Sequence, residues 1–465
     1  MLKTSVHKAL GGDVPVHSTI MIQGWVRTRR DSKAGFSFVQ IHDGSCFDAL
    51  QVVVDQKIVN YETEIKQLTV GCAVAVSGEL VESPGKKQQV ELRAKSLSVI
   101  GWVDEPESYA LAAKHHSLEH LRDNAHLRPR SNTFGAISRI RQKLAVAIHN
   151  YFDEKGFVWV NTPIITTSDC EGAGDLFRVS KLDLANRNLQ KTGPINGQHD
   201  FFGSPTYLTV SGQLNLECYC LALSKVYTFG PAFRAENSNT SRHLAEFWMI
   251  EPEIAFADLR DNADLAENLL QTVARELMEH CQKDLEFFNK RHNQKLLKRL
   301  SDLVNTQFER IDYTHAIKIL KKSNYSFEFE VAWGLDLQSE HERYLTEKYF
   351  RKPVIVMNYP KDIKAFYMRL NDDNKTVAAM DVLVPGMGEI IGGSQREERL
   401  TVLDARITNK DVRKELWWYR ELRRYGTVPH SGFGLGFERF LGYVTGMDNV
   451  RDLIPFPRTP KSAPF

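Results

Sequence analysis

The sequence lacks the features that mark membrane and secreted proteins. No apolar run in its 465 residues approaches the roughly 18 residues of a membrane span, and the N-terminus does not have the layout of a signal peptide. Its 6 cysteines are scattered without a C-x-x-C pair, and Cys218 and Cys220, two apart on an apparent helix, have a poor spacing for zinc. These absences favour a cytoplasmic protein with reduced thiols and no membrane partner.

The chain also lacks a strong charge of either sign. Lys+Arg 60 against Asp+Glu 58 leaves a net charge of +2, so no global positive field indicates a nucleic acid, and any RNA contact must come from local patches. A hydrophobic content of 42% and a charged content of 25% are those of an ordinary globular protein. The length predicts two or three domains.

The first part of the chain, residues 1–103, has the pattern of a small β-barrel. Short apolar or alternating segments between turn residues predict five strands, at 19–26, 35–42, 49–54, 73–78 and 90–94. This pattern fits a Greek-key barrel of the OB type. Arg30 and its basic neighbours lie beside Phe36 and Phe38, a mixture that suits single-stranded nucleic acid, although basic loops on small barrels are common.

The rest of the chain predicts a linker and one larger domain. Residues 104–130, with proline, several histidines and mixed charges, indicate a linker or hinge, and 131–465 form the second domain. Within this domain the pattern becomes helical and charged at 258–322, which we interpret as an insertion. The predicted strands are grouped with little βαβ alternation, which favours an α+β fold around an antiparallel sheet.

The octet Gly432-Phe-Gly-Leu-Gly-Phe-Glu-Arg439 opens an apolar helical segment. Glycines that alternate with large apolar residues let a flat ligand lie against a strand. Arg439 follows at the start of the predicted helix, where an anion can also bind. The segment is not a dinucleotide fingerprint, because G-x-G-x-x-G requires glycine at Phe437. A buried strand followed by a helix with a solvated arginine is the alternative.

Residues 233–253 predict a strand, a polar loop and a returning strand. Alternation places Arg234 and Glu236 on one face of the first strand. On the returning strand it places Phe247, Glu251 and Glu253 on one face, although Pro252 can break this pattern. An arginine, carboxylates, a basic loop and an aromatic ring suit a bent nucleoside triphosphate. A charged surface hairpin is the alternative, but it fits poorly with so many apolar neighbours.

Together the two segments resemble motifs 2 and 3 of the class II aminoacyl-tRNA synthetases, in the aspartate/asparagine/lysine subgroup. Motif 2 corresponds to Phe-Arg-Ala-Glu at 233–236 and Arg-His-Leu-Ala-Glu-Phe at 242–247, motif 3 to 434–439, and motif 1 to 156–163. The resemblance spans the whole chain. It implies an N-terminal OB-type barrel, a class II catalytic domain with an antiparallel sheet flanked by helices, and a homodimer formed through motif 1.

The resemblance implies activation of an amino acid with ATP and its transfer to tRNA. Arg234 matches the arginine that bridges the α-phosphate and the substrate carboxylate, Arg439 the one that holds the γ-phosphate, and Phe247 the ring that stacks on adenine. Further ATP contacts fall on Glu236, Arg242 and His243. Asp381 and Glu389 are the expected Mg²⁺ ligands, since hard carboxylate oxygens suit that ion. In aspartate-specific relatives the two acids are one residue closer, and two acids near a surface turn remain the alternative.

The resemblance also implies an amino-acid site. Its residues are Glu171 for the ammonium group, Gln213 for the carboxylate end, Arg396 for the side-chain oxygen, and Ser211 and Glu251 beside them. Leu216 stands where the aspartate-specific enzymes carry a lysine, and Glu251 where they carry an aspartate. Leu216 removes the cation that would pair with an aspartate side chain, and Glu251 is a longer acceptor that would repel it. Both changes favour L-asparagine over aspartate as the substrate.

The barrel residues that match anticodon contacts are Arg30, Phe38, Gln51 and Glu91, and the implied nucleic-acid partner is asparagine tRNA. Three other functions are consistent with parts of the pattern. One is an aspartate-specific member, including one that also charges asparagine tRNA. Another is a synthetase-like asparagine synthetase, a family that lacks the barrel. The third is a non-catalytic tRNA-binding paralogue, which would not need to keep Arg234, Arg439 and the two acids.

Overall fold

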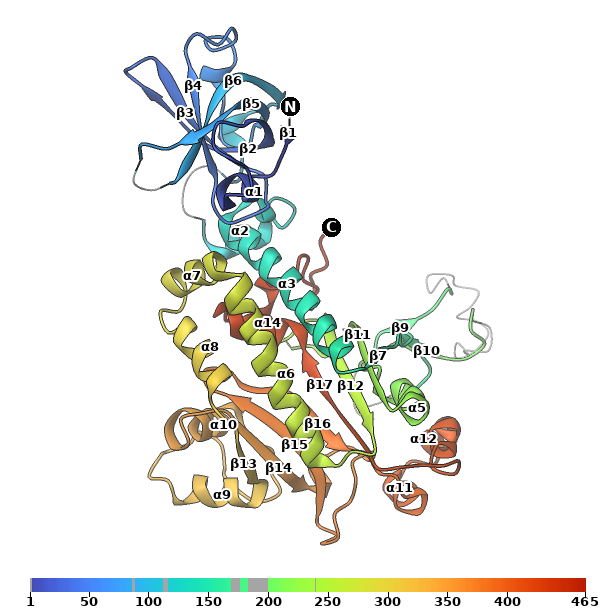
Figure 1. The fold of residues 1–465 in the computed structure, drawn as a ribbon. Helices are drawn as coiled ribbons and strands as arrows, with labels where there is room; N and C mark the ends of the chain where they lie inside the picture. Colours follow the sequence, from blue (N-terminus) through green and yellow to red (C-terminus); the bar gives the residue numbers. More distant parts are fainter. Residues whose placement is uncertain (1, 86–87, 112–115, 169–175, 183–199, 239) are drawn as a thin grey trace. The chain divides into compact units, whose positions relative to one another are not determined.

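The computed structural model describes residues 2–85, 88–111, 116–168, 176–182, 200–238 and 240–465. The chain forms two compact units, Met1–Arg139 and Ile140–Phe465 (Figure 1). The boundary falls within helix α3 (Asn132–Glu154). No helix in the described ranges combines the length and apolar character that crossing a bilayer requires.

The first unit contains a closed five-stranded barrel. The strands are β2 (Thr19–Ser32), β3 (Phe36–His42), β4 (Leu50–Asp55), β6 (Val90–Gly101) and β5 (Ala73–Glu82), in that order, and β5 pairs back with β2. Alternate apolar residues such as Ile22, Val39 and Val76 are fully buried inside it. The OB-type barrel predicted from the sequence is therefore confirmed.

Smaller elements complete this unit. They are β1 (Leu2–Lys3), α1 (Val6–Gly11), η1 (Ile65–Gln67), η2 (Pro106–Ser108), α2 (Leu118–Asp123) and η3 (Arg128–Arg130). The last three lie in the segment predicted to be a linker. In η3, Arg128 is buried, with its guanidinium carbon 4.2 Å from the centroid of the Phe134 ring.

Strand β2 continues beyond its predicted end at residue 26. Thr28 pairs with Gln40, and Arg30 pairs with Phe38. Arg27, Arg29 and Arg30 therefore belong to a strand and not to a loop. Apolar alternation cannot reveal this extension, because its side chains are polar while its backbone completes the ladder with β3.

The second unit is built on an eight-stranded sheet. In order across the sheet the strands are β13 (Glu309–Asp312), β14 (Val354–Pro360), β15 (Thr376–Val384), β16 (Gly388–Gln395), β17 (His430–Gly436), β12 (Glu246–Ala255), β11 (Lys225–Phe233) and β7 (Val158–Trp159). All neighbours are antiparallel except β13–β14 and β11–β7, which are parallel. The α+β fold around an antiparallel sheet is confirmed. A smaller sheet contains β8 (Ile165–Thr166), β10 (Thr206–Leu208) and β9 (Arg178–Val179).

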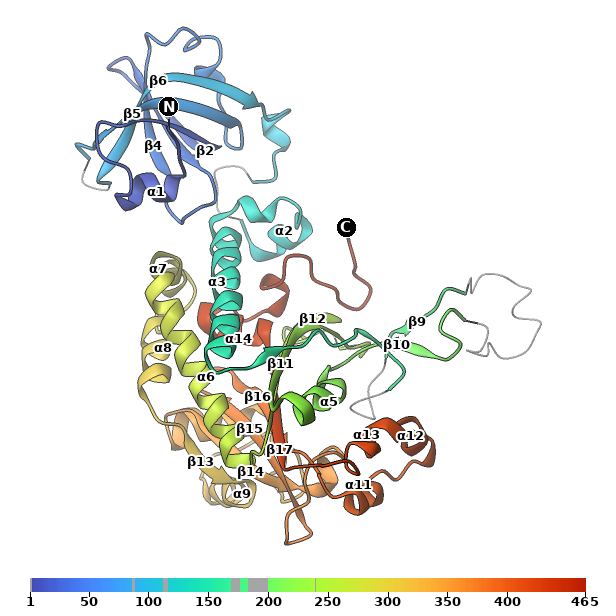
Figure 2. The ribbon, with the colours of Figure 1, turned by 45° about the vertical axis from the view of Figure 1, so that its right-hand side comes forward.

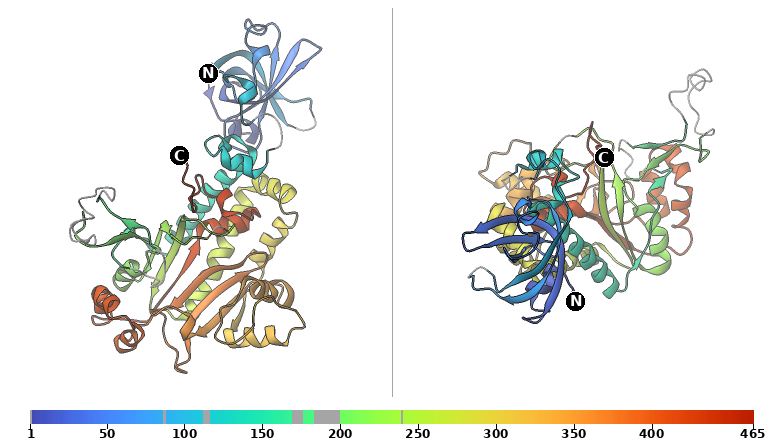
Figure 3. Two further views of the ribbon diagram at one scale, coloured as in Figure 1. Left: turned by 180° about the vertical axis from the view of Figure 1, so that it is seen from behind. Right: turned by 90° about the horizontal axis from the view of Figure 1, so that it is seen from above.

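The second unit also contains helices within its described residues. They are α5 (Gln213–Leu223), α6 (Leu259–His280), α7 (Gln282–Arg291), α8 (Leu296–Asn305), α9 (Tyr313–Lys322), α10 (Ser339–Arg343), α11 (Leu400–Arg406), α12 (Lys410–Glu415), α13 (Trp417–Glu421) and α14 (Phe437–Thr445), with the short turns η5 (Tyr344–Tyr349), η6 (Lys361–Ile363) and η7 (Val450–Asp452). Figures 2 and 3 show α6 along one face of the sheet, where it packs on β15, β16 and β17.

Helix α6 begins the segment 258–322, and it belongs to the core of this unit. Asp258 caps it by accepting from the backbone N–H groups of Arg260 and Asp261. Asn262 is fully buried and donates from Nδ2 to the carbonyl oxygen of Gly432, at 2.9 Å. The segment also supplies β13, which pairs with β14. The helical pattern alone does not predict that strand.

Three glycines allow the close approach of the central strands. A Cβ on Gly432 would overlap the Glu253 carboxylate and the Pro252 carbonyl oxygen of β12. A Cβ on Gly434 would lie 2.7 Å from Met249 Cε, the flexible end of a side chain. On Gly392, a Cβ would lie 3.1 Å from Glu389 Oε1. The space that side chains at these positions would fill is therefore taken by groups of neighbouring residues, mainly the carboxylates of Glu253 and Glu389.

We expect Gly432→Ala to lower the free energy of unfolding by about 1–3 kcal/mol, the usual cost of overpacking. Gly434→Ala is the matched control and should cost less, because methionine adapts by rotating. Urea unfolding of both variants and the wild type measures the difference. Equal stabilities of the two variants would contradict this account of the β12–β17 approach.

Candidate active site

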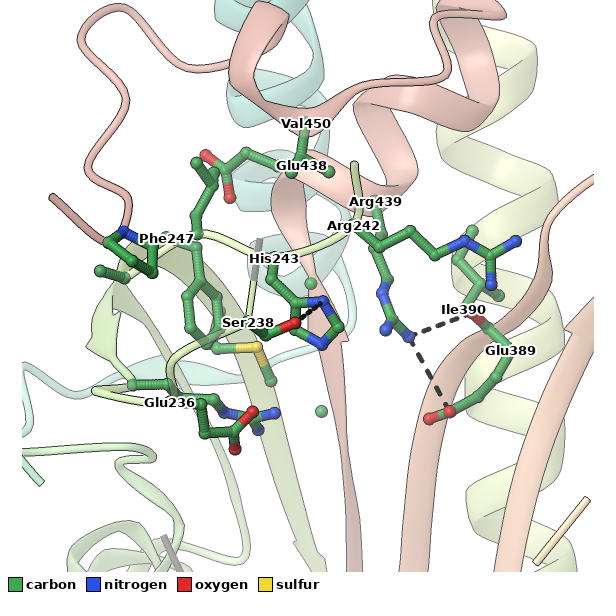
Figure 4. Close-up of a pocket in the computed structure, with 17 residues that line it drawn as sticks. Glu236, Ser238, Arg242, His243, Phe247, Glu389, Ile390, Glu438, Arg439 and Val450 are labelled. Carbon is green, nitrogen blue, oxygen red and sulfur yellow. Dashed lines mark hydrogen bonds and ion pairs between the residues drawn. The ribbon is translucent and has the colours of Figure 1, made fainter. Parts of the chain in front are cut away.

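Two adjoining cavities open on the face of the sheet formed by β12, β16 and β17. Arg234, Met249, Glu389 and Gly434 line both of them. The first has a volume of about 210 Å³, and its lining includes Glu236, Arg242, His243, Phe247 and Arg439 (Figure 4). The second has a volume of about 230 Å³, and its lining includes Ser211, Gln213, Glu251, Asp381 and Arg396.

The first cavity lies between an aromatic ring and an arginine. Arg234 directly follows β11, and its guanidinium carbon is 5.4 Å from the centroid of the Phe247 ring. On the other side, Arg439 in the first turn of α14 donates from NH1 to the backbone oxygen of Glu389, at 3.3 Å. The same nitrogen is 3.8 Å from Glu389 Oε2. Figure 4 shows Phe247 and Arg439 on opposite sides of the cavity, an arrangement that can hold a flat base between them.

A basic loop borders this cavity. His243 Nδ1 is 3.2 Å from Ser238 Oγ, and Arg242 donates from NH1 to Ser339 Oγ at 2.8 Å. Strand β11 ends at Phe233, so Glu236 does not share a strand face with Arg234 as alternation predicts. It is exposed on the loop and lines the same cavity. Cations around a cavity of this kind suit an anionic ligand such as a polyphosphate.

The two predicted metal ligands converge over Gly392. A Cβ at this position would be 3.1 Å from Glu389 Oε1 and 3.6 Å from Asp381 Oδ1, so both carboxylates occupy the space that any larger residue would fill. Two carboxylates facing one space repel each other unless a cation lies nearby. A pair of hard oxygen donors fits Mg²⁺, which usually takes one or two carboxylates together with substrate phosphates and water. Within the described residues no larger cluster of metal-binding side chains occurs.

A β-bulge lies between β15 and β16 near these two acids. The register of β15 and β16 shifts between Val382, which pairs with Ile391, and Leu383, which pairs with Glu389. The bulge absorbs one extra residue on β16. It lies between the pairing of Asp381 with Gly392 and the pairing of Leu383 with Glu389.

Lys364 joins this group, although the sequence pattern does not single it out. Its Nζ is 3.0 Å from Asp381 Oδ2 and 4.1 Å from the centroid of the Tyr359 ring. It follows η6 in an irregular segment that the structure places against β15. A lysine in a loop has no local signal that would identify it.

Arg396 is held by a buried ion pair. Its Nε donates to Glu253 Oε2 at 3.2 Å, its NH2 donates to Glu253 Oε1, and its NH1 donates to Ser394 Oγ at 2.8 Å. Burial alone would lower the pKa of Arg396, but the paired Glu253 carboxylate raises it overall. Three of the five guanidinium N–H groups are therefore used, which leaves two for a ligand. Alternation places Glu253 on this face but does not predict its pairing with Arg396.

Glu251 is also buried. It accepts from the Ser211 hydroxyl and, at 3.0 Å, from the backbone N–H of Gly212. Leu216 is fully buried in an apolar cluster with Cys220 and Val226, and it is not among the described residues that line the cavity. Glu171 lies outside the described residues.

The barrel brings the four predicted nucleic-acid contacts together. Arg30 and Gln51 line one hollow, and Phe38 pairs with Arg30 across β2 and β3. Gln51 donates from Nε2 to Glu91 Oε2 at 3.2 Å. The rings of Phe36 and Phe38 meet edge to face, with centroids 5.0 Å apart. The result is a polar hollow beside an aromatic pair.

Known proteins resemble the chain over its whole length. Residues 117–460 match the family model described as tRNA synthetases class II (D, K and N), and residues 20–100 match the OB-fold nucleic acid binding domain. The chain is 61% identical over 465 residues to the asparagine--tRNA ligase of Hahella chejuensis (strain KCTC 2396), covering 100% of both. It is 62% identical over 462 residues to that of Histophilus somni (strain 2336), covering 99% of both.

A solved structure has the same fold. The crystal structure of asparaginyl-tRNA synthetase from Pyrococcus horikoshii complexed with asparaginyl-adenylate has a TM-score of 0.82 to this chain, with 34% identity over 96% of each. Its fold agrees with the barrel and the sheet described above. The chain therefore belongs to the class II tRNA synthetases of the D, K and N group.

Proposed function

We propose that the chain is an asparagine--tRNA ligase. A carboxylate oxygen of L-asparagine attacks the α-phosphorus of ATP, the bond to pyrophosphate breaks, and asparaginyl-adenylate forms. The terminal ribose hydroxyl of asparagine tRNA then attacks the carbonyl carbon, and AMP leaves. The observation that carries this proposal is the pair of cavities that share Arg234, one suited to a nucleotide and the other to a small polar amino acid.

In this function Arg234 lies where the two substrates react. A guanidinium that lines both cavities can bind the α-phosphate and the asparagine carboxylate together, and so hold them in position while charge develops. Its planar fork suits both groups better than the point charge of a lysine does. Phe247 and Arg439 hold the adenine between them, and Glu236, Arg242 and His243 contact ATP around the cavity.

Mg²⁺ would be held by Asp381 and Glu389, whose carboxylates converge over Gly392. When bound, this ion would neutralise phosphate charge. Lys364 contributes a fixed positive charge beside Asp381. When no ion is bound, this charge reduces the repulsion between the two carboxylates.

The donors and acceptors that line the amino-acid cavity distinguish asparagine from aspartate. The two remaining N–H groups of Arg396 donate to the side-chain oxygen of the substrate. Glu251 is an acceptor that favours the NH₂ of asparagine and repels the second carboxylate oxygen of aspartate. Its bonds with Ser211 and Gly212 fix it in place. Leu216 is buried in an apolar cluster and so places no cation at the position where the aspartate-specific relatives carry a lysine. Glu171 is proposed to bind the substrate ammonium.

Amino-acid-dependent pyrophosphate exchange tests this function directly. We expect the wild type to exchange with asparagine and to discriminate against aspartate. Glu251→Gln should lower kcat/KM for asparagine by roughly 5–150-fold, the equivalent of the about 1–3 kcal/mol cost of an unpaired buried group, and should narrow the preference over aspartate.

Ser211→Ala is the control for this variant, because it removes one donor to Glu251 and keeps the charge. It should retain the preference for asparagine. Equal use of both amino acids by the wild type would rule out the proposed substrate, and an unchanged ratio of kcat/KM values in Glu251→Gln would rule out this role for Glu251.

We propose that the barrel binds the anticodon of asparagine tRNA through Arg30, Phe38, Gln51 and Glu91. The hollow lined by Arg30 and Gln51 offers both a cation and an amide to a base. The Phe36–Phe38 pair offers a stacking surface beside it. Charging of tRNA also implies a cytoplasmic location, where translation takes place, and fractionation of cells that express the chain would check this.

Phe38→Ala should weaken tRNA binding by about 1–3 kcal/mol, the usual worth of one stacked base. Asparagine-dependent pyrophosphate exchange without tRNA should not change. Trp25→Ala removes another exposed ring from β2, at the position paired with His42, and serves as the control. Filter binding with asparagine tRNA measures the loss. Equal losses in both variants would argue against anticodon binding at Phe38.

We propose that the protein is a homodimer formed through motif 1. Strand β7 lies at the edge of the large sheet, and its Val158 and Trp159 are 46% and 54% exposed. Tyr219 and Leu223 of α5, which packs on the neighbouring β11, are also exposed. An exposed apolar edge of this kind suits a two-fold interface in which each subunit contributes the same residues.

Sedimentation at micromolar concentration should therefore give twice the chain mass of 53.1 kDa. Trp159→Glu should shift the protein toward the monomer, because a charge would be buried at the interface. Trp417→Glu changes a tryptophan that is 59% exposed on α13 and should leave the dimer intact. A wild type that sediments only as a monomer would refute the assembly.

A further inference from the structure

Glu217 is a buried carboxylate for which the reaction above has no role. It lies on α5, one turn after Gln213, and its side chain is fully shielded from solvent. Four side chains converge on its two oxygens: Gln213, Tyr419, Arg423 and His430. Burying a charge destabilises the fold unless the charge is paired and fully hydrogen-bonded. Its partners meet this condition, and the question is what the buried carboxylate does.

The contact with Gln213 determines how its amide is oriented. Nε2 of Gln213 donates to Glu217 Oε1 at 3.2 Å. Because an ionised carboxylate only accepts, it must face the NH₂ group of the amide and not the carbonyl. Residues four apart on a helix share a face, so the backbone of α5 holds the pair in register. Gln213 also lines the amino-acid cavity, which leaves its carbonyl oxygen for a ligand there.

The other three partners keep Glu217 charged. Arg423 donates from NH2 at 2.8 Å, and the Tyr419 hydroxyl lies 2.9 Å from each oxygen. Burial alone would raise the pKa of Glu217, but Arg423 and His430 lower it overall. His430 places Nε2 2.9 Å from Glu217 and Nδ1 2.8 Å from the carbonyl oxygen of Val428.

The same network reaches two other segments of the cavity wall. The carbonyl oxygen of His430 accepts from the backbone N–H of Arg396, at 2.8 Å. Arg423 donates from Nε to the carbonyl oxygen of Glu397, at 2.9 Å. The start of α5, the two residues that follow β16 and the start of β17 are therefore joined in one network around the Glu217 carboxylate.

We propose that Glu217 is a positioning residue for amino-acid binding, which orients the Gln213 amide so that its carbonyl oxygen accepts from the ammonium group of the substrate. The inference rests on the proposed function for the identity of that substrate. It differs from the role implied by family resemblance, in which Gln213 holds the carboxylate end. An acceptor favours an ammonium group and repels a carboxylate.

The test is pyrophosphate exchange, run with whichever amino acid supports exchange by the wild type. Glu217→Gln should raise KM for the amino acid at least tenfold, because a neutral amide accepts and donates and so no longer orients Gln213. KM for ATP should stay within twofold. In a Gln213→Ala background the same substitution should have no further effect on the amino-acid KM.

Tyr419→Phe is the matched control, because it removes a donor to Glu217 without touching Gln213. We expect a lower Tm and an amino-acid KM within twofold of the wild type. Glu217→Asp keeps the charge beside Arg423 but withdraws the carboxylate from Gln213. It should therefore raise the amino-acid KM in a chain that retains its buried ion pair, and it decides the question if Glu217→Gln does not fold.

A purely structural role predicts other results. If Glu217→Gln lowers kcat and raises both KM values alike, or if its effect adds to that of Gln213→Ala, the positioning role is overturned. An unchanged amino-acid KM in Glu217→Asp overturns it as well. A wild type that exchanges with another amino acid contradicts the proposed substrate alone, since the comparison of variants can still be made with that amino acid.

Discussion

The close approach of β16, β17 and β12 is the constraint on which the site depends. Gly392 and Gly434 line the cavities without a side chain, and Gly432 leaves room for the Glu253 carboxylate and the Pro252 carbonyl oxygen of β12. Carboxylates then occupy the freed space: Glu253 of β12 lies over Gly432, and Asp381 of β15 and Glu389 of β16 lie over Gly392. The lack of a Cβ atom at these glycines therefore has two effects: it lets the strands pack closely, and it lets a ligand approach the backbone.

Charge in this site is organised in buried pairs. Arg396 with Glu253, and Arg423 with Glu217, are almost completely shielded from solvent. Replacing such pairs with apolar residues is often neutral or stabilising, so their contribution is not primarily stability. Their value lies in fixed dipoles and donors that need no reorganisation when a polar substrate enters. The amino-acid cavity therefore combines a rigid polar wall with few remaining hydrogen-bonding groups.

Features that depend on the spacing of nearby residues can be predicted from the sequence. The motif around Gly432, the arginines at 234 and 439, and the five strands of the barrel all depend on neighbours within a few residues, and the structure brings the two arginines to one cavity. Partners that are distant in the chain could not be predicted. Glu217 and His430 are 213 positions apart, and in a linear pattern each resembles an ordinary surface group. Apolar alternation does not predict the extension of β2 through Arg30 for a related reason. Its side chains are polar, and only the backbone pairing with β3 shows that it is a strand.

The place of β17 in the sheet has a consequence for synthesis of the chain. The barrel closes within residues 19–101, so all its strands are available early, and domains fold as units, N-terminal first, as they leave the ribosome. The large sheet differs, because β17 (His430–Gly436) is its last strand in the chain and lies between β12 and β16. The half containing β7, β11 and β12 and the half containing β13 to β16 each present an open edge until β17 has been made. The strand that completes the active site is therefore also the one that ends the exposure of both edges, late in translation.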